Sequence, residues 1–246
     1  RVIWSERVSG SFTAMLDGTE LGVDIAASIV RAILSGEHER ARSRPLETVE
    51  HHTLLIAGVS LMHSLSQREF SRAIELLTAL TRRASRVSSP LAWMARWHNL
   101  RVLQGWSDNA EKDAQTARDL CNRALDADPH NALAHVMLAM THTHLERRLD
   151  LAAQSYDTAI EMNHSEPLAW LMRGALRSFT DDGEGAKADV AHANALSPVD
   201  PQRYYYLTLT AGAHLTAGDD EKALTLATES LRLNRRHVST LRVKAA

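Results

Sequence analysis

The sequence repeats a pair of small residues at an interval that one helical hairpin would fill. Four alanines are separated by 35, 34 and 37 residues: Ala117, Ala152, Ala186 and Ala223. Each is followed seven residues later by a second small residue: Ala124, Ala159, Ala193 and Ser230. Residues seven apart share one face of an α-helix, and small side chains on that face let two helices approach closely. The spacing therefore predicts an all-α solenoid of stacked helical hairpins.

One unit carries most of a known repeat pattern. It has Trp170, a small residue at Gly174, Ala186 opening the second helix, and Pro198 at its end. This unit resembles the tetratricopeptide repeat. The resemblance implies a right-handed solenoid whose concave wall is formed by the first helix of each hairpin. We expect about five hairpins over residues 45–246, with a final half-repeat beginning near His237.

The first 44 residues do not follow the repeat. Residues 1–8 alternate weakly, as a strand does, and Ser9-Gly10 indicates a turn. A helix is expected over Ile25–Leu34, ended by Gly36 and followed by a basic linker. We therefore expect residues 1–44 to be a strand-plus-helix remnant of a preceding α/β region. Since the chain opens on Arg1, we also expect it to be a piece of a longer protein.

This leading region carries a second resemblance, through Ile3-Trp4-Ser5-Glu6-Arg7 and Pro45-Leu46-Glu47. It is similar to bacterial multidomain signalling proteins in which a small α/β region joins an output domain to a tetratricopeptide array. The resemblance implies a regulatory module of a cytoplasmic signalling protein. Two alternatives stay open: the C-terminal tail of a class III adenylate cyclase whose catalytic domain is absent, or of a winged-helix transcription regulator.

Composition argues against several kinds of partner. The net charge is −2 with mixed signs, which gives no basic surface for nucleic acid or an anionic membrane. The longest apolar run, residues 54–62, is far shorter than the roughly 18 residues that cross a bilayer. A single cysteine, Cys121, excludes an internal disulfide framework. We expect a cytoplasmic chain that binds neither nucleic acid nor membrane.

No motif indicates catalysis, a metal or a cofactor. His135, His142 and His144 cluster, but a metal would need further ligands from a neighbouring helix. The acidic segment 181–185 lacks the spacing of a calcium loop and suits a turn at a helix start. We therefore expect a non-enzymatic chain with no catalytic residue, no metal ligand and no cofactor.

The predicted function is protein or peptide binding on the concave wall. The partner would be another protein, a second copy of the chain, or the absent output domain. The expected wall holds no Lys, Asn or Arg that could clamp a carboxylate, so an apolar or amphipathic segment is favoured. The alternative is that some of these side chains only pack against the next hairpin. The expected contacts are Leu133, Val136, Met140, Thr143, Leu168, Leu171, Ala175, Ser178, Tyr205 and Thr208.

Two aromatic groups stand out beside this pattern. Three successive tyrosines, residues 204–206, would spread around a helix, so at least one is expected to be exposed. A helix is expected over Pro90–Trp106, with Trp93 and Trp97 on one face. We interpret its tryptophans first as core and second as a dimer or domain contact.

Overall fold

The computed structural model describes residues 19–63 and 66–246, and within these ranges every regular element is helical. A long helix, α2 (Thr19–Ser43), is followed by a short 3-10 turn, η1 (Leu46–Thr48), and then by helical hairpins. The hairpins are α3 (His51–Leu61) with α4 (Gln67–Arg83), α5 (Ser88–Leu103) with α6 (Ala110–Ala127), α7 (Ala132–Thr141) with α8 (Leu149–Met162), α9 (Pro167–Phe179) with α10 (Gly183–Leu196), and α11 (Arg203–Thr216) with α12 (Asp220–Leu233). A last helix, α13 (Val238–Ala245), packs on α12 and α11 as a half-repeat. The expected all-α solenoid is confirmed.

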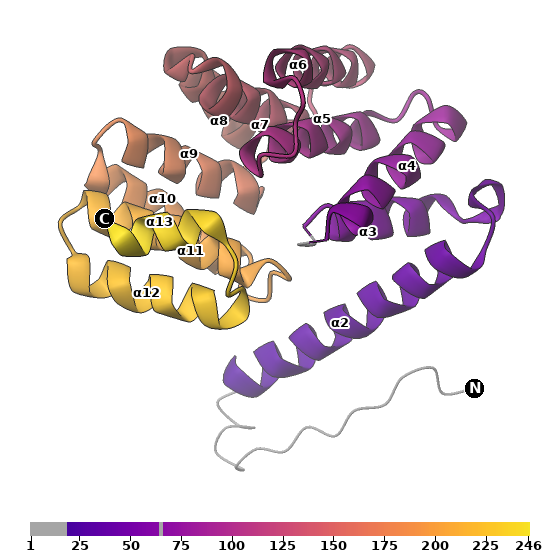
Figure 1. Ribbon diagram of the computed structural model, residues 1–246. Helices are drawn as coiled ribbons and strands as arrows, with labels where there is room; N and C mark the ends of the chain where they lie inside the picture. Colours follow the sequence, from indigo (N-terminus) through magenta and orange to yellow (C-terminus); the bar gives the residue numbers. More distant parts are fainter. Residues whose placement is uncertain (1–18, 64–65) are drawn as a thin grey trace.

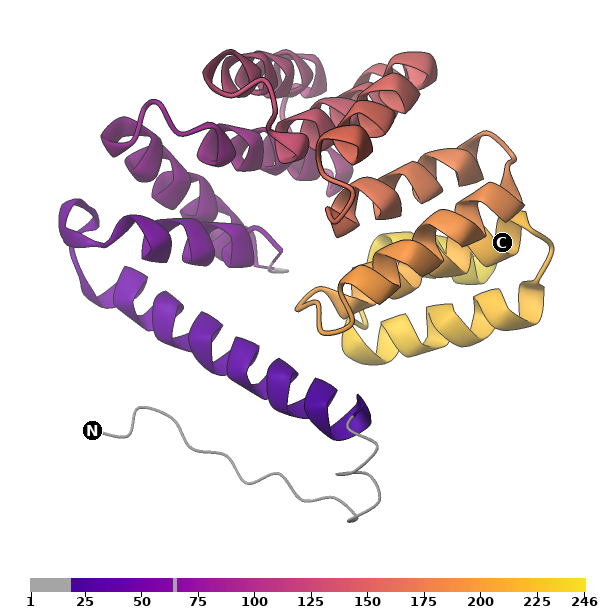
Figure 2. The same cartoon turned by 180° about the vertical axis from the view of Figure 1, so that it is seen from behind.

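The hairpins follow one another along an arch (Figure 1). Helices α6 and α8 lie at its crown, while α2 and α12 lie at its two feet, and Figure 2 shows the same arrangement from behind. Successive first helices contact one another along the array, α5 with α7, α7 with α9, and α9 with α11. Within the described residues, no helix is both long and apolar enough to traverse a lipid bilayer.

Side-chain caps fix where four of the five second helices begin, and α8 is the exception. Asn109 accepts a hydrogen bond from the Lys112 N–H at 2.9 Å, and Asp182 accepts one from the Gly185 N–H at 2.9 Å. Asp219 plays the same part for α12. Such caps satisfy backbone N–H groups that have no partner inside the helix. The acidic segment 181–185 is therefore a turn and helix start, as its sequence indicates.

The repeated small residues lie where the hairpin helices meet. All eight are buried: Ala117, Ala124, Ala152, Ala159, Ala186, Ala193, Ala223 and Ser230. The first helices contribute matching small residues, among them Gly174 on α9. A Cβ atom at Gly174 would lie 2.8 Å from Val190 Cγ1 and 3.1 Å from the Ala186 carbonyl oxygen. The repeated small residues therefore mark the positions where the two helices of a hairpin are in close contact.

Buried carboxylates tie the helices of two hairpins together. Asp189 on α10 accepts from both Nε and Nη2 of Arg173 on α9, each at 2.8 Å. Asp113 on α6 lies 2.6 Å from Nδ1 of His98 on α5 and accepts from Ser107 Oγ. Burial acts to raise the Asp113 pKa, but the hydrogen bonds from Ser107 and His98 outweigh it, and the pKa is lowered. The Asp113 carboxylate therefore stays ionised at neutral pH.

Two expected helix ends were wrong, and the first is at Gly36. Helix α2 runs through Gly36 to Ser43 and so includes Arg40 and Arg42 of the expected linker. The helical turn after Gly36 is held by Glu37, which is buried and bonds to Arg40 and to Thr53 on α3. The expected strand over residues 1–8 lies outside the described residues.

The second expected helix end that was wrong is that of α5. This helix ends at Leu103 rather than at Trp106, because Gly105 has a φ of 72° that breaks the helix. Trp106 then folds back so that its ring centroid lies 4.9 Å from that of Phe70. Trp97 stacks on the same phenyl ring at 4.7 Å and is only 7% exposed. The interpretation of Trp97 as a core residue is confirmed.

Substitution of two interior helix glycines should have opposite effects. Gly174→Ala should destabilise the fold by about 1–3 kcal/mol because the new methyl group overlaps Val190 Cγ1 and is crowded by the Ala186 carbonyl oxygen. Gly212→Ala, in α11 with nothing within 4 Å of the new Cβ, should stabilise it by about 0.5–1 kcal/mol. Urea unfolding followed by circular dichroism measures both. Equal midpoints for the two variants would contradict the close contact at Gly174.

Candidate functional site

The ten residues expected to contact a partner fall into two groups. Six are buried inside the fold: Val136, Met140, Thr143, Leu171, Ala175 and Thr208. The other four are half-buried: Leu133, Leu168, Ser178 and Tyr205. In this conformation a partner can touch only the second group. The larger group packs between hairpins, which is the alternative that the sequence left open.

Three half-buried residues form a ridge, which we call the apolar ridge: Leu133, Leu168 and Tyr205. They are 35 and 37 residues apart and lie in the first turns of α7, α9 and α11. All three pack on the same buried cluster and leave part of their surface uncovered. The Tyr205 hydroxyl donates to Met172 Sδ at 3.2 Å, which fixes the ring. Its neighbours Tyr204 and Tyr206 are half-buried and buried, so none of the three tyrosines is fully exposed.

Helix α5 adds two polar residues to the inner wall that sequence reasoning missed. Arg96 lies nine residues after the N-cap of α5, as Met140 does after that of α7. Asn99 likewise matches Thr143, twelve residues after the cap. The expected wall was limited to α7, α9 and α11, so it did not include these two residues. Counting from helix starts instead of from the alanines would have found both, because the long connection before α6 shifts the alanine register.

Arg96 is a buried cation without a counter-charge among the described residues. It is 1% exposed, and Nη1 donates to Met140 Sδ at 3.0 Å, a weak acceptor. Its guanidinium also lies over the Tyr205 ring, 5.6 Å from the centroid. Nε has no hydrogen-bond partner in the described part of the chain. Burying a charge in this state carries a penalty of several kcal/mol, which one thioether and one ring face offset only in part.

A break in helix geometry lies beside Arg96. Helix α7 passes into a π-turn, η2 (His142–Glu146), after which Arg147 takes a left-handed φ of 55°. Such turns insert one residue and often occur at functional sites. Here His142 Nδ1 lies 2.8 Å from Glu146 Oε2 within the turn. His144 is half-buried in this turn, and burial, with a smaller effect of the Arg96 charge, lowers its pKa to about 4.

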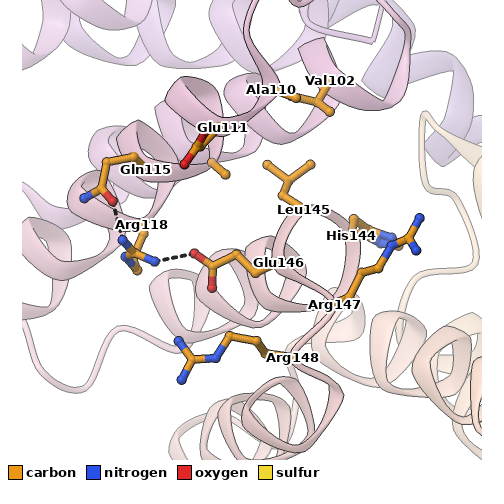
Figure 3. Close-up of a pocket in the computed structure, with 11 residues that line it drawn as sticks. Val102, Ala110, Glu111, Gln115, Arg118, His144, Leu145, Glu146, Arg147 and Arg148 are labelled. Atoms are coloured by element: carbon orange, nitrogen blue, oxygen red, sulfur yellow. Dashed lines mark hydrogen bonds and ion pairs between the residues drawn. The ribbon is translucent and has the colours of Figure 1, made fainter.

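The π-turn, His144 included, also lines a surface pocket of about 490 Å³ (Figure 3). Helix α6 contributes Glu111, Gln115 and Arg118, and the π-turn contributes His144 and Glu146. Arg118 donates to Glu146 across the pocket, so that cation is neutralised. The residues that follow the π-turn on the rim, 147 and 148, are exposed arginines. The pocket is open and nearly balanced in charge, which fits solvent better than a specific ligand.

Metal binding by the clustered histidines finds no geometric support in the described part of the chain. No group of three or more His, Cys, Asp or Glu side chains there could hold a metal ion. His135 Nε2 lies 3.2 Å from the Pro129 carbonyl oxygen, so this histidine and His142 each have a local partner. Cys121 is buried, and burial raises the pKa of its thiol far above the ordinary range.

His144 should make stability depend on pH. Its folded pKa of about 4 lies below the ordinary 6.5, so the folded state favours the neutral ring. The resulting stability is complete above pH 6.5 and is lost as pH falls toward 4, by up to about 1.4 kcal/mol per pH unit. His144→Gln should reduce this slope, whereas His51→Gln at an exposed position should not. Urea unfolding at pH 7 and pH 5 measures the slope; an unchanged slope in His144→Gln would contradict the assignment.

Comparison with known proteins supports the fold. No family model matches the sequence, and no curated protein matches it. The structure is similar to TTC0263, a thermophilic TPR protein of Thermus thermophilus, with a TM-score of 0.59 and 17% identity over 80% of this chain and 98% of that one. Weaker similarity extends to YrrB, a TPR protein with an unusual peptide-binding site (TM-score 0.43, 18% identity, 80% and 93% covered), and to a tetratricopeptide repeat protein from Parabacteroides merdae (0.45, 16%, 79% and 71%). The first similarity confirms the tetratricopeptide resemblance at the level of fold.

Proposed function

We propose that this chain is a non-enzymatic interaction module that binds a protein or peptide along the apolar ridge. The observation that carries the proposal is that Leu133, Leu168 and Tyr205 lie in the first turns of three successive first helices, pack on one buried cluster and are each partly uncovered. A row of apolar side chains on a packed scaffold suits one apolar face of a helix or extended peptide. Because the scaffold already orders these side chains, binding costs little of their conformational entropy.

Tyr205 is the expected anchor of this contact. Its ring is held on one side by Arg96 and at its tip by Met172. A large, immobilised aromatic side chain gains contact area at low entropic cost, and such residues are enriched among those that dominate binding energy. Ser178, in the last turn of α9, would add a polar contact beyond the ridge.

The buried members of the expected site support the ridge from below. Leu171 is fully buried, so a charged residue there would disrupt packing before it affected a partner. Leu168, three residues earlier on α9, is half-buried and is the better position for testing contact. The proposed contact set is therefore Leu133, Leu168, Ser178 and Tyr205.

The narrower proposal is that this module regulates a multidomain bacterial signalling protein in the cytoplasm. The order of the sequence features supports this narrower proposal: first the Trp4 motif, then a helix, then a hairpin array. The division between leading region and array would lie near Arg44, just after α2. The occupant of the ridge would then be another protein, a second copy, or an output domain. The two alternatives are an adenylate-cyclase and a winged-helix output domain, and the full sequence of such a parent protein would distinguish them.

A photo-crosslinking amino acid at the ridge should capture the partner. Placed at Leu168 in the producing organism, it should give one dominant adduct, since that side chain faces the partner. The same group at Glu161, exposed on α8, is the matched control and should give none. Mass spectrometry of the adduct identifies another protein or a second copy. Identical adducts from both positions, or none from Leu133, Leu168 and Tyr205 alike, would show that the ridge is not the binding surface.

A further inference from the structure

Helix α2 carries an apolar face that the rest of the described chain leaves uncovered. Every exposed isoleucine of the described residues lies on this helix: Ile25 is 39% exposed, Ile29 42% and Ile33 50%. The helix lies at one foot of the arch, and among the described residues it packs mainly on α3 (Figure 1). The outermost helix of a stacked array normally turns a polar face to solvent. An apolar outer face therefore indicates a partner.

Two glycines lie on the same face, and contacts within the described chain do not explain them. Gly22 lies three residues before Ile25, and Gly36 lies three residues after Ile33. At 100° per residue, the glycines and the three isoleucines fall within an arc of about 80°. A Cβ atom at either glycine would have nothing within 4 Å. Since glycine inside a helix costs about 1 kcal/mol relative to alanine, two glycines on one exposed face indicate a close approach to another helix.

The residues of this face are arranged symmetrically about Ile29. Alanines lie three residues on either side of it, isoleucines four, and glycines seven. The face spans about 21 Å along the helix and holds no charged residue. Arg31 is exposed on the opposite side of the helix. We call this face the α2 stripe: Gly22, Ile25, Ala26, Ile29, Ala32, Ile33 and Gly36.

A stripe with this symmetry is complementary to a second copy of itself across a two-fold axis. When two such helices pair antiparallel about Ile29, Ile25 lies beside the partner's Ile33, and Gly22 lies beside the partner's Gly36. Each isoleucine then meets another isoleucine, while the small residues let the two backbones approach closely. A two-fold dimer requires one surface that matches itself in this way. A parallel pair or an unrelated helix would make no use of the symmetry.

We propose that two copies of this chain dimerise by antiparallel pairing of their α2 helices, centred on Ile29. Removal of the isoleucine side chains from water drives the association. One helix per chain gives a contact smaller than the roughly 800 Å² per partner of a standard interface, so the dimer should form reversibly and depend on concentration. The α2 stripe shares no residue with the apolar ridge, and this proposal does not rest on the proposed function.

Sedimentation velocity of the purified chain over a wide range of concentration tests whether it dimerises. The wild type should pass from monomer to dimer as its concentration rises. Ile29→Glu should weaken dimerisation by at least about tenfold, because two carboxylates would then meet at the axis. Arg31→Glu is the control: it changes the net charge more, but on the opposite side of the helix, and should dimerise like the wild type. Mixing Ile29→Glu with Ile29→Lys should restore a dimer, since opposite charges then meet.

Cysteine substitution tests the antiparallel register. The native Cys121 is buried and should not take part in crosslinking. Under mild oxidation, Ile29→Cys should form a disulfide-linked dimer by itself, because the two thiols meet at the axis. Ile25→Cys and Ile33→Cys should each crosslink poorly alone and efficiently when mixed. Arg31→Cys, on the opposite side of the helix, should not crosslink. All these positions are exposed, so the variants should fold, and circular dichroism checks this.

Three results would overturn the proposal. The first is a chain that stays monomeric at every concentration, which would leave the stripe to another protein or to another segment of the chain. The second is a dimer that Ile29→Glu does not weaken. The third is crosslinking of Ile25→Cys and Ile33→Cys alone as readily as when mixed, which would indicate parallel helices. Crosslinking at Leu168 reports on the ridge alone, so this proposal and the proposed function can fail independently.

Discussion

The structure depends on how closely the two helices of each hairpin approach. At Gly174 the facing helix α10 comes near enough that even a methyl group would overlap Val190 Cγ1 and lie tightly against the Ala186 carbonyl oxygen, and alanines occupy the corresponding places elsewhere. Large side chains cannot stand between such helices, so each hairpin is thin and buries little by itself. Stability must then come from stacking one hairpin on the next, which is why the chain forms an array rather than a single compact core.

Stacking leaves the inner wall with two physically different regions. Along the first turns of α7, α9 and α11, apolar side chains remain partly uncovered and form the apolar ridge. Deeper in the wall, the same helices turn their side chains into the interior, and α5 places a guanidinium there. The first region leaves apolar surface uncovered, whereas the second buries a cation within the fold. One repeat geometry thus gives two chemically different environments.

The π-turn after α7 shows how one local irregularity affects the surrounding wall. It places His144 where burial lowers its pKa, and it gives Glu146 a position from which it pairs with His142 and Arg118. Arg147, in a left-handed conformation, is the strained residue that lets the chain leave this turn and start α8. The π-turn contains no glycine or proline, so composition offers little sign of the break.

Sequence periodicity by itself determined the hairpins, their order and the small residues between them, because small residues seven apart lie on one helix face and fit close helix contact. It also identified the turn at Asp182 and the buried character of Trp97. The end of α2 was misplaced, since the helical turn after Gly36 is held by a bond between Glu37 and Thr53 that is distant in sequence. Only the tertiary structure decided which side of each first helix is covered. Likewise, only the tertiary structure shows that Arg96 has no counter-charge among the described residues. Those facts depend on how successive hairpins rotate against one another, and a rotation of 100° per residue turns a one-residue difference in register into a different face.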